Sequence, residues 1–77
     1  MNKLRRKKLN EIAEQISSIR EELETLKDEE EEYLDNMPEN LQSSEKYEKS
    51  EDAISEMESA LDYIDEAISS IESATGE

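Results

Sequence analysis

Apolar residues recur every three and four positions over two long segments of the chain, separated by a short polar connection that contains the single proline. In the second segment, residues 53–73 form three seven-residue blocks that each begin with Ala and a large apolar residue. A seven-residue repeat keeps one apolar stripe on one side of an α-helix, where it packs against another helix. The pattern predicts helices over about residues 3–35 and 44–75, with a connection over about residues 36–43.

Each predicted helix carries its own stripe of alternating three- and four-residue spacing. The first stripe consists of Leu9, Ile12, Ile16, Ile19, Leu23, Leu26, Glu30, Tyr33 and Met37. The second consists of Tyr47, Ser50, Ile54, Met57, Leu61, Ile64, Ile68 and Ile71. Pro38 has no amide hydrogen and ends the first helix, and so short a connection makes the two helices antiparallel neighbours. The predicted fold is all-α: residues 1–77 form a single antiparallel two-helix coiled-coil hairpin.

The register of this hairpin follows from the two stripes. Facing core residues have numbers that sum to 80, from Leu9 with Ile71 to Leu26 with Ile54, and Glu30 then faces Ser50. The same register places cations of the first helix beside carboxylates of the second: Arg6 with Glu72, Arg20 with Glu58, and Lys27 with Glu51. Because the apolar pattern and the charge pattern are independent, their agreement favours an intramolecular hairpin.

A chain of 77 residues with 32% hydrophobic residues has a thin core, and a lone two-helix coil leaves one side of its core exposed to solvent. A strip of small residues follows the second stripe: Ala53, Ala60, Ala67 and Ala74. We expect the hairpin either to dimerise, as a homodimer that forms a four-helix bundle, or to dock on another protein.

The absence of Cys and His excludes thiol chemistry, disulfides, zinc sites and histidine acid-base catalysis. There is also no glycine-rich phosphate-binding loop, so we expect no enzyme activity and no cofactor or metal. No apolar run is long enough for a membrane span. We expect no membrane association and a cytoplasmic location in a bacterium or bacterial host cell.

The chain has 23 acidic and 9 basic residues, a net charge of -14, and its basic residues concentrate at the start. The candidate partner-binding surface consists of exposed acidic positions: Glu21, Glu24, Asp28, Glu31, Glu32, Asp52, Glu56, Asp62 and Glu66. Ordered carboxylates can imitate the phosphates that basic nucleic-acid-binding proteins recognise. The alternative is a solvated coiled-coil face. The acidic bulk argues against direct nucleic-acid binding.

The basic start has two interpretations. The candidate contacts are Lys3, Arg5 and Lys7. Either the acidic C-terminal end of the hairpin compensates their charge, or they bind a phosphate backbone or an acidic partner.

The segment 29–48 reads EEEEYLDNMPENLQSSEKYE, and its DNMPENLQ connection carries the most specific part of a resemblance. The chain resembles, over nearly its whole length, small acidic helical-hairpin proteins encoded in Firmicutes genomes, often by phages and mobile elements. That family has no settled function, so the resemblance transfers no site residues. A phage or mobile-element setting implies a small inhibitor of a host or defence protein.

The function expected from the sequence is a non-enzymatic protein-protein interaction module. Its most concrete form is an inhibitor whose acidic surface occupies the nucleic-acid-binding groove of a basic partner. The alternative is a structural or assembly protein that forms a homo-oligomeric bundle.

Overall fold

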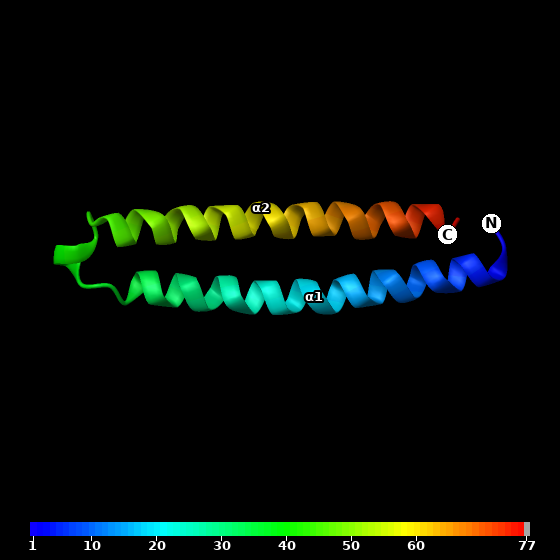
Figure 1. Ribbon diagram of the computed structural model, residues 1–77, viewed down its shortest axis with the longest axis horizontal. Coiled ribbons are helices and arrows are strands. Elements are labelled where there is room, and N and C mark those ends of the chain that lie inside the picture. Colours follow the sequence, from blue (N-terminus) through cyan, green and yellow to red (C-terminus); the bar gives the residue numbers. More distant parts are fainter. Residues whose placement is uncertain (77) are drawn as a thin grey trace.

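The computed structural model describes residues 1–76, and within them the chain forms two long antiparallel α-helices. Helix α1 spans Lys3–Asp35 and helix α2 spans Glu45–Ala74, and a connection with the short 3₁₀ helix η1 (Glu39–Leu41) joins them. The helices lie side by side in a rod of 60 × 15 × 14 Å, with both ends of the chain at the end opposite η1 (Figure 1). The predicted all-α helical hairpin is confirmed.

Side-chain and backbone caps define where each helix begins and ends. The side chain of Asn2 accepts a hydrogen bond from the Arg5 amide, and that of Ser44 accepts one from the Tyr47 amide, at 2.8 and 3.3 Å. Each cap satisfies an amide that has no partner inside its helix. Helix α1 stops before Pro38, and α2 stops before Gly76, whose φ of 80° suits a residue without Cβ.

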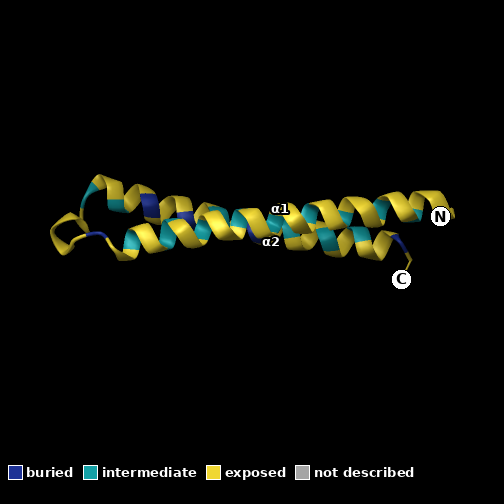
Figure 2. Ribbon diagram, turned by 90° about the horizontal axis from the view of Figure 1, so that it is seen from below, coloured by how far each residue is buried: buried dark blue, intermediate teal, exposed yellow. Residues whose placement is uncertain are grey.

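The core of the hairpin lies along the predicted stripe of α2. Ile54, Leu61 and Ser50 are buried, and the remaining members of that stripe are half-buried (Figure 2). From α1 and the connection, Met37 alone of the described residues is buried. A two-helix layer covers each helix on one side only, so most core residues of both helices are half-buried. The stripe predicted for α2 is therefore confirmed, and the core is as thin as the composition indicates.

The stripe predicted for α1 is half wrong. Ile12, Ile19, Leu26 and Tyr33 have exposed fractions of 44%, 56%, 56% and 51%. Their places against α2 are taken by the residues that follow each of them in sequence, Ala13, Arg20, Lys27 and Leu34, which are half-buried beside Leu9, Ile16 and Leu23. Successive residues of an α-helix are turned by about 100°, so α1 is rotated about its own axis relative to the expected packing.

This rotation also changes the ion pairs between the helices. Among the described residues, the three expected pairs with Glu72, Glu58 and Glu51 do not form. Arg20 instead reaches Asp65, and the Arg6 side chain donates a hydrogen bond to the Thr75 carbonyl at 3.0 Å. The predicted polar layer is confirmed, because the Ser50 hydroxyl donates to a carboxylate oxygen of Glu30 at 2.6 Å.

Candidate acidic interaction surface

The rotation of α1 gives the hairpin two different long sides. Arg20 and Ile19 are neighbours in sequence and lie at opposite margins of the stripe that packs against α2. Arg20 meets Asp65 on one side of the hairpin, whereas Ile19 points to the other. We call the first the acidic side, because its groove is lined by Glu31, Asp35, Glu51 and Glu58. The opposite one, which carries the exposed Ile12, Ile19, Leu26 and Tyr33, is the apolar side.

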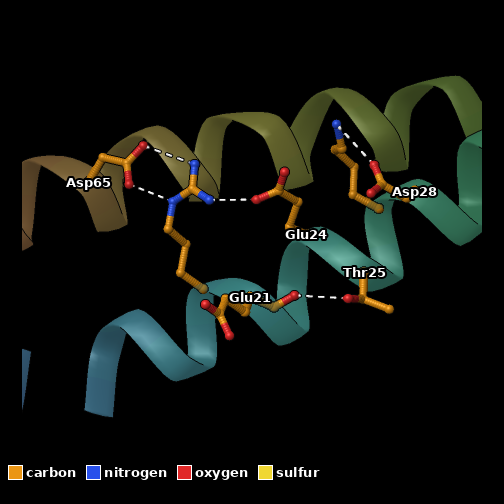
Figure 3. Close-up of polar contacts among 7 residues, drawn as sticks. Glu21, Glu24, Thr25, Asp28 and Asp65 are labelled. Carbon is orange, nitrogen blue, oxygen red and sulfur yellow. Dashed lines mark hydrogen bonds and ion pairs between the residues drawn. The ribbon is translucent and has the colours of Figure 1, made fainter. Parts of the chain in front are cut away.

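Arg20 holds the centre of the acidic side together. Its guanidinium makes two hydrogen bonds to the Asp65 carboxylate, at 2.5 and 3.1 Å, and one to Glu24 at 2.6 Å (Figure 3). The hydrogen bonds to Asp65, and then the one to Glu24, raise the pKa of Arg20 above its usual value. A two-pronged Arg–carboxylate contact fixes orientation as well as distance, so this contact links α1 to α2 on the acidic side.

Lys27 lies one helical heptad further along the same margin of α1. Its ammonium is 3.5 Å from an Asp28 oxygen and 3.4 Å from a Glu31 oxygen. Partial burial lowers the pKa of Lys27, but the hydrogen bond to Glu31 and the charges of both carboxylates outweigh that effect, so the pKa is raised. Lys27 thus stays within α1 and does not cross to α2.

Beyond Lys27, towards the connection, the acidic side is hollowed into a groove of about 370 Å³ between the helices. Leu34 and Ile54 supply apolar surface, and carboxylates come from both helices: Glu31 and Asp35 of α1, Glu51 and Glu58 of α2. Within residues 1–76, Glu31 is the one of these four with an ion-pair partner. The groove therefore combines an apolar surface with a rim of concentrated negative charge.

The structure does not gather the nine acidic residues expected from the sequence into one surface. Glu24, Asp28 and Glu31 are tied to Arg20 or Lys27, and of the nine only Glu31 lines the groove. Glu21 and Glu32 are exposed on α1.

The four expected residues of α2 are all exposed, and they lie on different faces of that helix: Asp52, Glu56, Asp62 and Glu66. Asp52 lies two residues from both Ser50 and Ile54, and Glu66 stands likewise between Ile64 and Ile68, so both point away from α1. None of these four residues lines the groove on the acidic side.

Sequence reasoning missed three of the four groove carboxylates: Asp35, Glu51 and Glu58. Glu51 and Glu58 were expected to be neutralised by Lys27 and Arg20, and only the rotation of α1 releases them. The available signal was their position, since both immediately flank the α2 core stripe and recur at a seven-residue spacing.

The three candidate basic contacts, Lys3, Arg5 and Lys7, are exposed in the first turns of α1 and form no ion pair within residues 1–76. Arg6 is the residue of this region that contacts α2, through the Thr75 carbonyl, and it also donates to the Met1 carbonyl at 3.0 Å. The ends of the hairpin are thus joined by a hydrogen bond from the Arg6 side chain to a backbone carbonyl, and Lys3, Arg5, Lys7 and Lys8 are exposed.

A second hollow, of about 680 Å³, lies at the connection. Its lining is mostly apolar and includes Tyr33, Met37, Pro38 and Leu41. Tyr33 belongs also to the apolar side, so the hollow continues the row of exposed apolar side chains to the end of the rod.

Comparison with family models found no match for this chain, and neither the curated proteins nor the solved structures include a significantly similar one. The resemblance to acidic hairpin proteins of phages and mobile elements therefore stays a prediction. In residues 1–76, neither helix has a stretch apolar enough to cross a membrane. The same residues contain no group of three or more Asp or Glu side chains placed so that they could hold a metal ion.

Proposed function

We propose that this protein is a non-enzymatic protein-binding module whose acidic groove receives basic side chains of a partner. The observation that carries the proposal is the groove itself, in which four carboxylates from two helices surround Leu34 and Ile54.

The chemistry of the groove matches Arg and Lys side chains. These side chains have an aliphatic stem and a charged head, and they place the stem on apolar surface while the head stays among polar groups. Leu34 and Ile54 suit the stem, and the carboxylates of Asp35, Glu51 and Glu58 suit the head. A guanidinium that is hydrogen-bonded by carboxylates forms contacts about twice as strong as neutral hydrogen bonds.

The net charge of -14 supports a nucleic-acid-binding protein as the partner. Such proteins carry arrays of Lys and Arg, and a rod 60 Å long with carboxylates on most faces competes for those arrays as duplex DNA does. A small inhibitor from a phage or mobile element, acting on a host or defence protein in the bacterial cytoplasm, is the biological form of this proposal.

The test starts from a groove variant in which the four carboxylates become amides: Glu31→Gln, Asp35→Asn, Glu51→Gln and Glu58→Gln. The matched control removes the same charge elsewhere: Glu11→Gln, Glu14→Gln, Asp52→Asn and Glu66→Gln. All four control residues are exposed and none has an ion-pair partner in residues 1–76. Circular dichroism verifies that both variants remain helical.

The wild-type chain and both variants are immobilised and exposed to a bacterial lysate at low salt, and the bound proteins are quantified by mass spectrometry. We expect the wild type and the control to retain the same nucleic-acid-binding proteins, the groove variant to lose them, and duplex DNA to displace them. Affinity should fall steeply with salt, because the contacts are ionic. Retention by the groove variant, or binding unchanged in high salt, contradicts the proposal.

A structural role is the second candidate, and the apolar side favours it. Four large apolar side chains in a row remain accessible on α1, and a surface of this kind is covered in most soluble proteins. The two roles use opposite sides of the hairpin, so one chain can serve both.

A further inference from the structure

The apolar side is a regular surface built from two helices. On α1 its members recur at a seven-residue spacing: Ile12, Ile19, Leu26 and Tyr33. On α2 the margin away from Asp65 carries Ala53, Ala60 and Ala67, which precede the core residues Ile54, Leu61 and Ile68. Large side chains on one helix and small ones on the other form a shallow face that a second layer of helices can cover.

The centre of this face lies at the same position along the long axis of the rod on both helices. Ile19 is the middle of the three aliphatic residues on α1, and Ala60 is the middle of the three alanines. The contact between Glu30 and Ser50, with residue numbers that sum to 80, and the contact between Arg6 and Thr75, which sum to 81, fix the register at both ends. Ile19 therefore lies level with residues 61 and 62, next to Ala60.

A twofold axis through this centre maps the face onto itself. If the axis runs across the helices, α1 packs antiparallel on α1 of a second copy, and facing residues have numbers that sum to 38. Ile19 then meets Ile19, and Ile12 meets Leu26. On α2 the same axis places Ala60 on Ala60 and Ala53 on Ala67. One operation thus pairs apolar with apolar along both helices.

The charges beside the face agree with this orientation. Lys8 of one copy comes to lie beside Glu29 of the other, and Gln15 beside Glu22, so no like charges meet along that margin. Arg5 lies across from Tyr33, whose ring is half exposed and suits a cation over its face. The five cations of residues 1–8 of one copy also approach the run of carboxylates at residues 28–32 of the other copy.

The size of the face reaches what a specific dimer needs. From Ile12 to Tyr33 it extends roughly 30 Å along α1 at 1.5 Å per residue, and with two helices it is roughly 20 Å wide. A second copy would bury roughly 600 Å² per chain, or roughly 1,200 Å² in all, which is the lower end of the range of specific protein interfaces.

We propose that the occupant of the apolar side is a second copy of this chain, packed antiparallel about a twofold axis through Ile19 and Ala60 into a four-helix bundle. The acidic grooves lie on the opposite side of each hairpin and stay open in the dimer. The dimer therefore presents two grooves on its two outer faces, whether or not these grooves bind a basic partner.

Sedimentation equilibrium tests whether a second copy of the chain occupies the apolar side. The wild type should sediment with twice the 8.9 kDa mass of one chain. Ile19→Lys places two cations together at the axis and should weaken association by roughly a hundredfold or more. Ser17→Lys adds the same charge at an exposed position on the acidic side and should leave the dimer intact. A monomeric wild type, or equal behaviour of the two variants, overturns the proposal.

Cysteine cross-linking tests the orientation, because the chain has no cysteine of its own. Under mild oxidation Ile19→Cys and Ala60→Cys should each form a disulfide-linked dimer, since each residue meets its own copy at the axis. Ser17→Cys should remain a monomer on a non-reducing gel. If α1 packed instead on α2 of the second copy, Ile19→Cys and Ala60→Cys would cross-link only when mixed, and that result overturns the proposed axis.

Discussion

The rotation of α1 makes a direct prediction about which apolar side chains hold the hairpin together. Leu61 of α2 is 6% exposed, whereas Ile19 of α1 is 56% exposed. Full burial of a large aliphatic side chain contributes roughly 1.5–3 kcal/mol, and truncation of a buried one to Ala costs roughly 2–5 kcal/mol. Leu61→Ala should therefore lower the free energy of unfolding by about 2–4 kcal/mol, and Ile19→Ala by less than about 1 kcal/mol in the monomer.

The assay is urea denaturation followed by the helical circular dichroism signal. It is performed at a protein concentration low enough for sedimentation to show monomers, because a dimer would add a contribution from Ile19. Ile12→Ala and Leu26→Ala, at 44% and 56% exposure, should behave as Ile19→Ala does. If Ile19→Ala costs as much as Leu61→Ala in the monomer, the packing of α1 described above is wrong.

Three other perturbations have predictable outcomes. Ser44→Ala removes the cap of α2 and should cost about 1 kcal/mol in urea denaturation, whereas Ser43→Ala should cost little. Raising NaCl from ~50 mM to ~500 mM should raise the melting temperature, because it screens repulsion within a chain of net charge -14; a lower melting temperature would mean that the ion pairs outweigh the repulsion. The pKa of Lys27 is raised in the folded chain, so its contribution to stability is present below the usual lysine pKa and is lost as the pH rises through the raised value. In strong alkali, the free energy of unfolding of the wild type should therefore fall relative to that of Lys27→Met.

The helical hairpin was predictable because the signals for it are local. The seven-residue repeat, the proline of the connection and the short link between the segments each act over a few residues. The stripe of α2 was also predictable. Three rows of positions along α2 can face a partner helix, and only two of these rows carry large apolar residues, so the pattern leaves no choice between them.

The rotation of α1 was not predictable, because three rows of that helix compete for two places. The row of Leu9, Ile16 and Leu23 faces α2 in either packing, and either of its two neighbouring rows can accompany it. One neighbouring row is more apolar, but the other supplies Leu34 and the bidentate contact of Arg20 with Asp65. A sequence pattern does not resolve so small a difference in free energy, and the groove carboxylates depend on the outcome.

The most direct test of the proposed function is isothermal titration of a captured partner with the wild type, the groove variant and the matched control. Both variants lose the same number of charges, so a difference between them reports the groove and not the total charge. Loss of three or four charge-assisted contacts should weaken the groove variant by roughly a hundredfold, and the control should stay within roughly threefold of the wild type. Equal losses in the two variants would contradict a binding site in the groove.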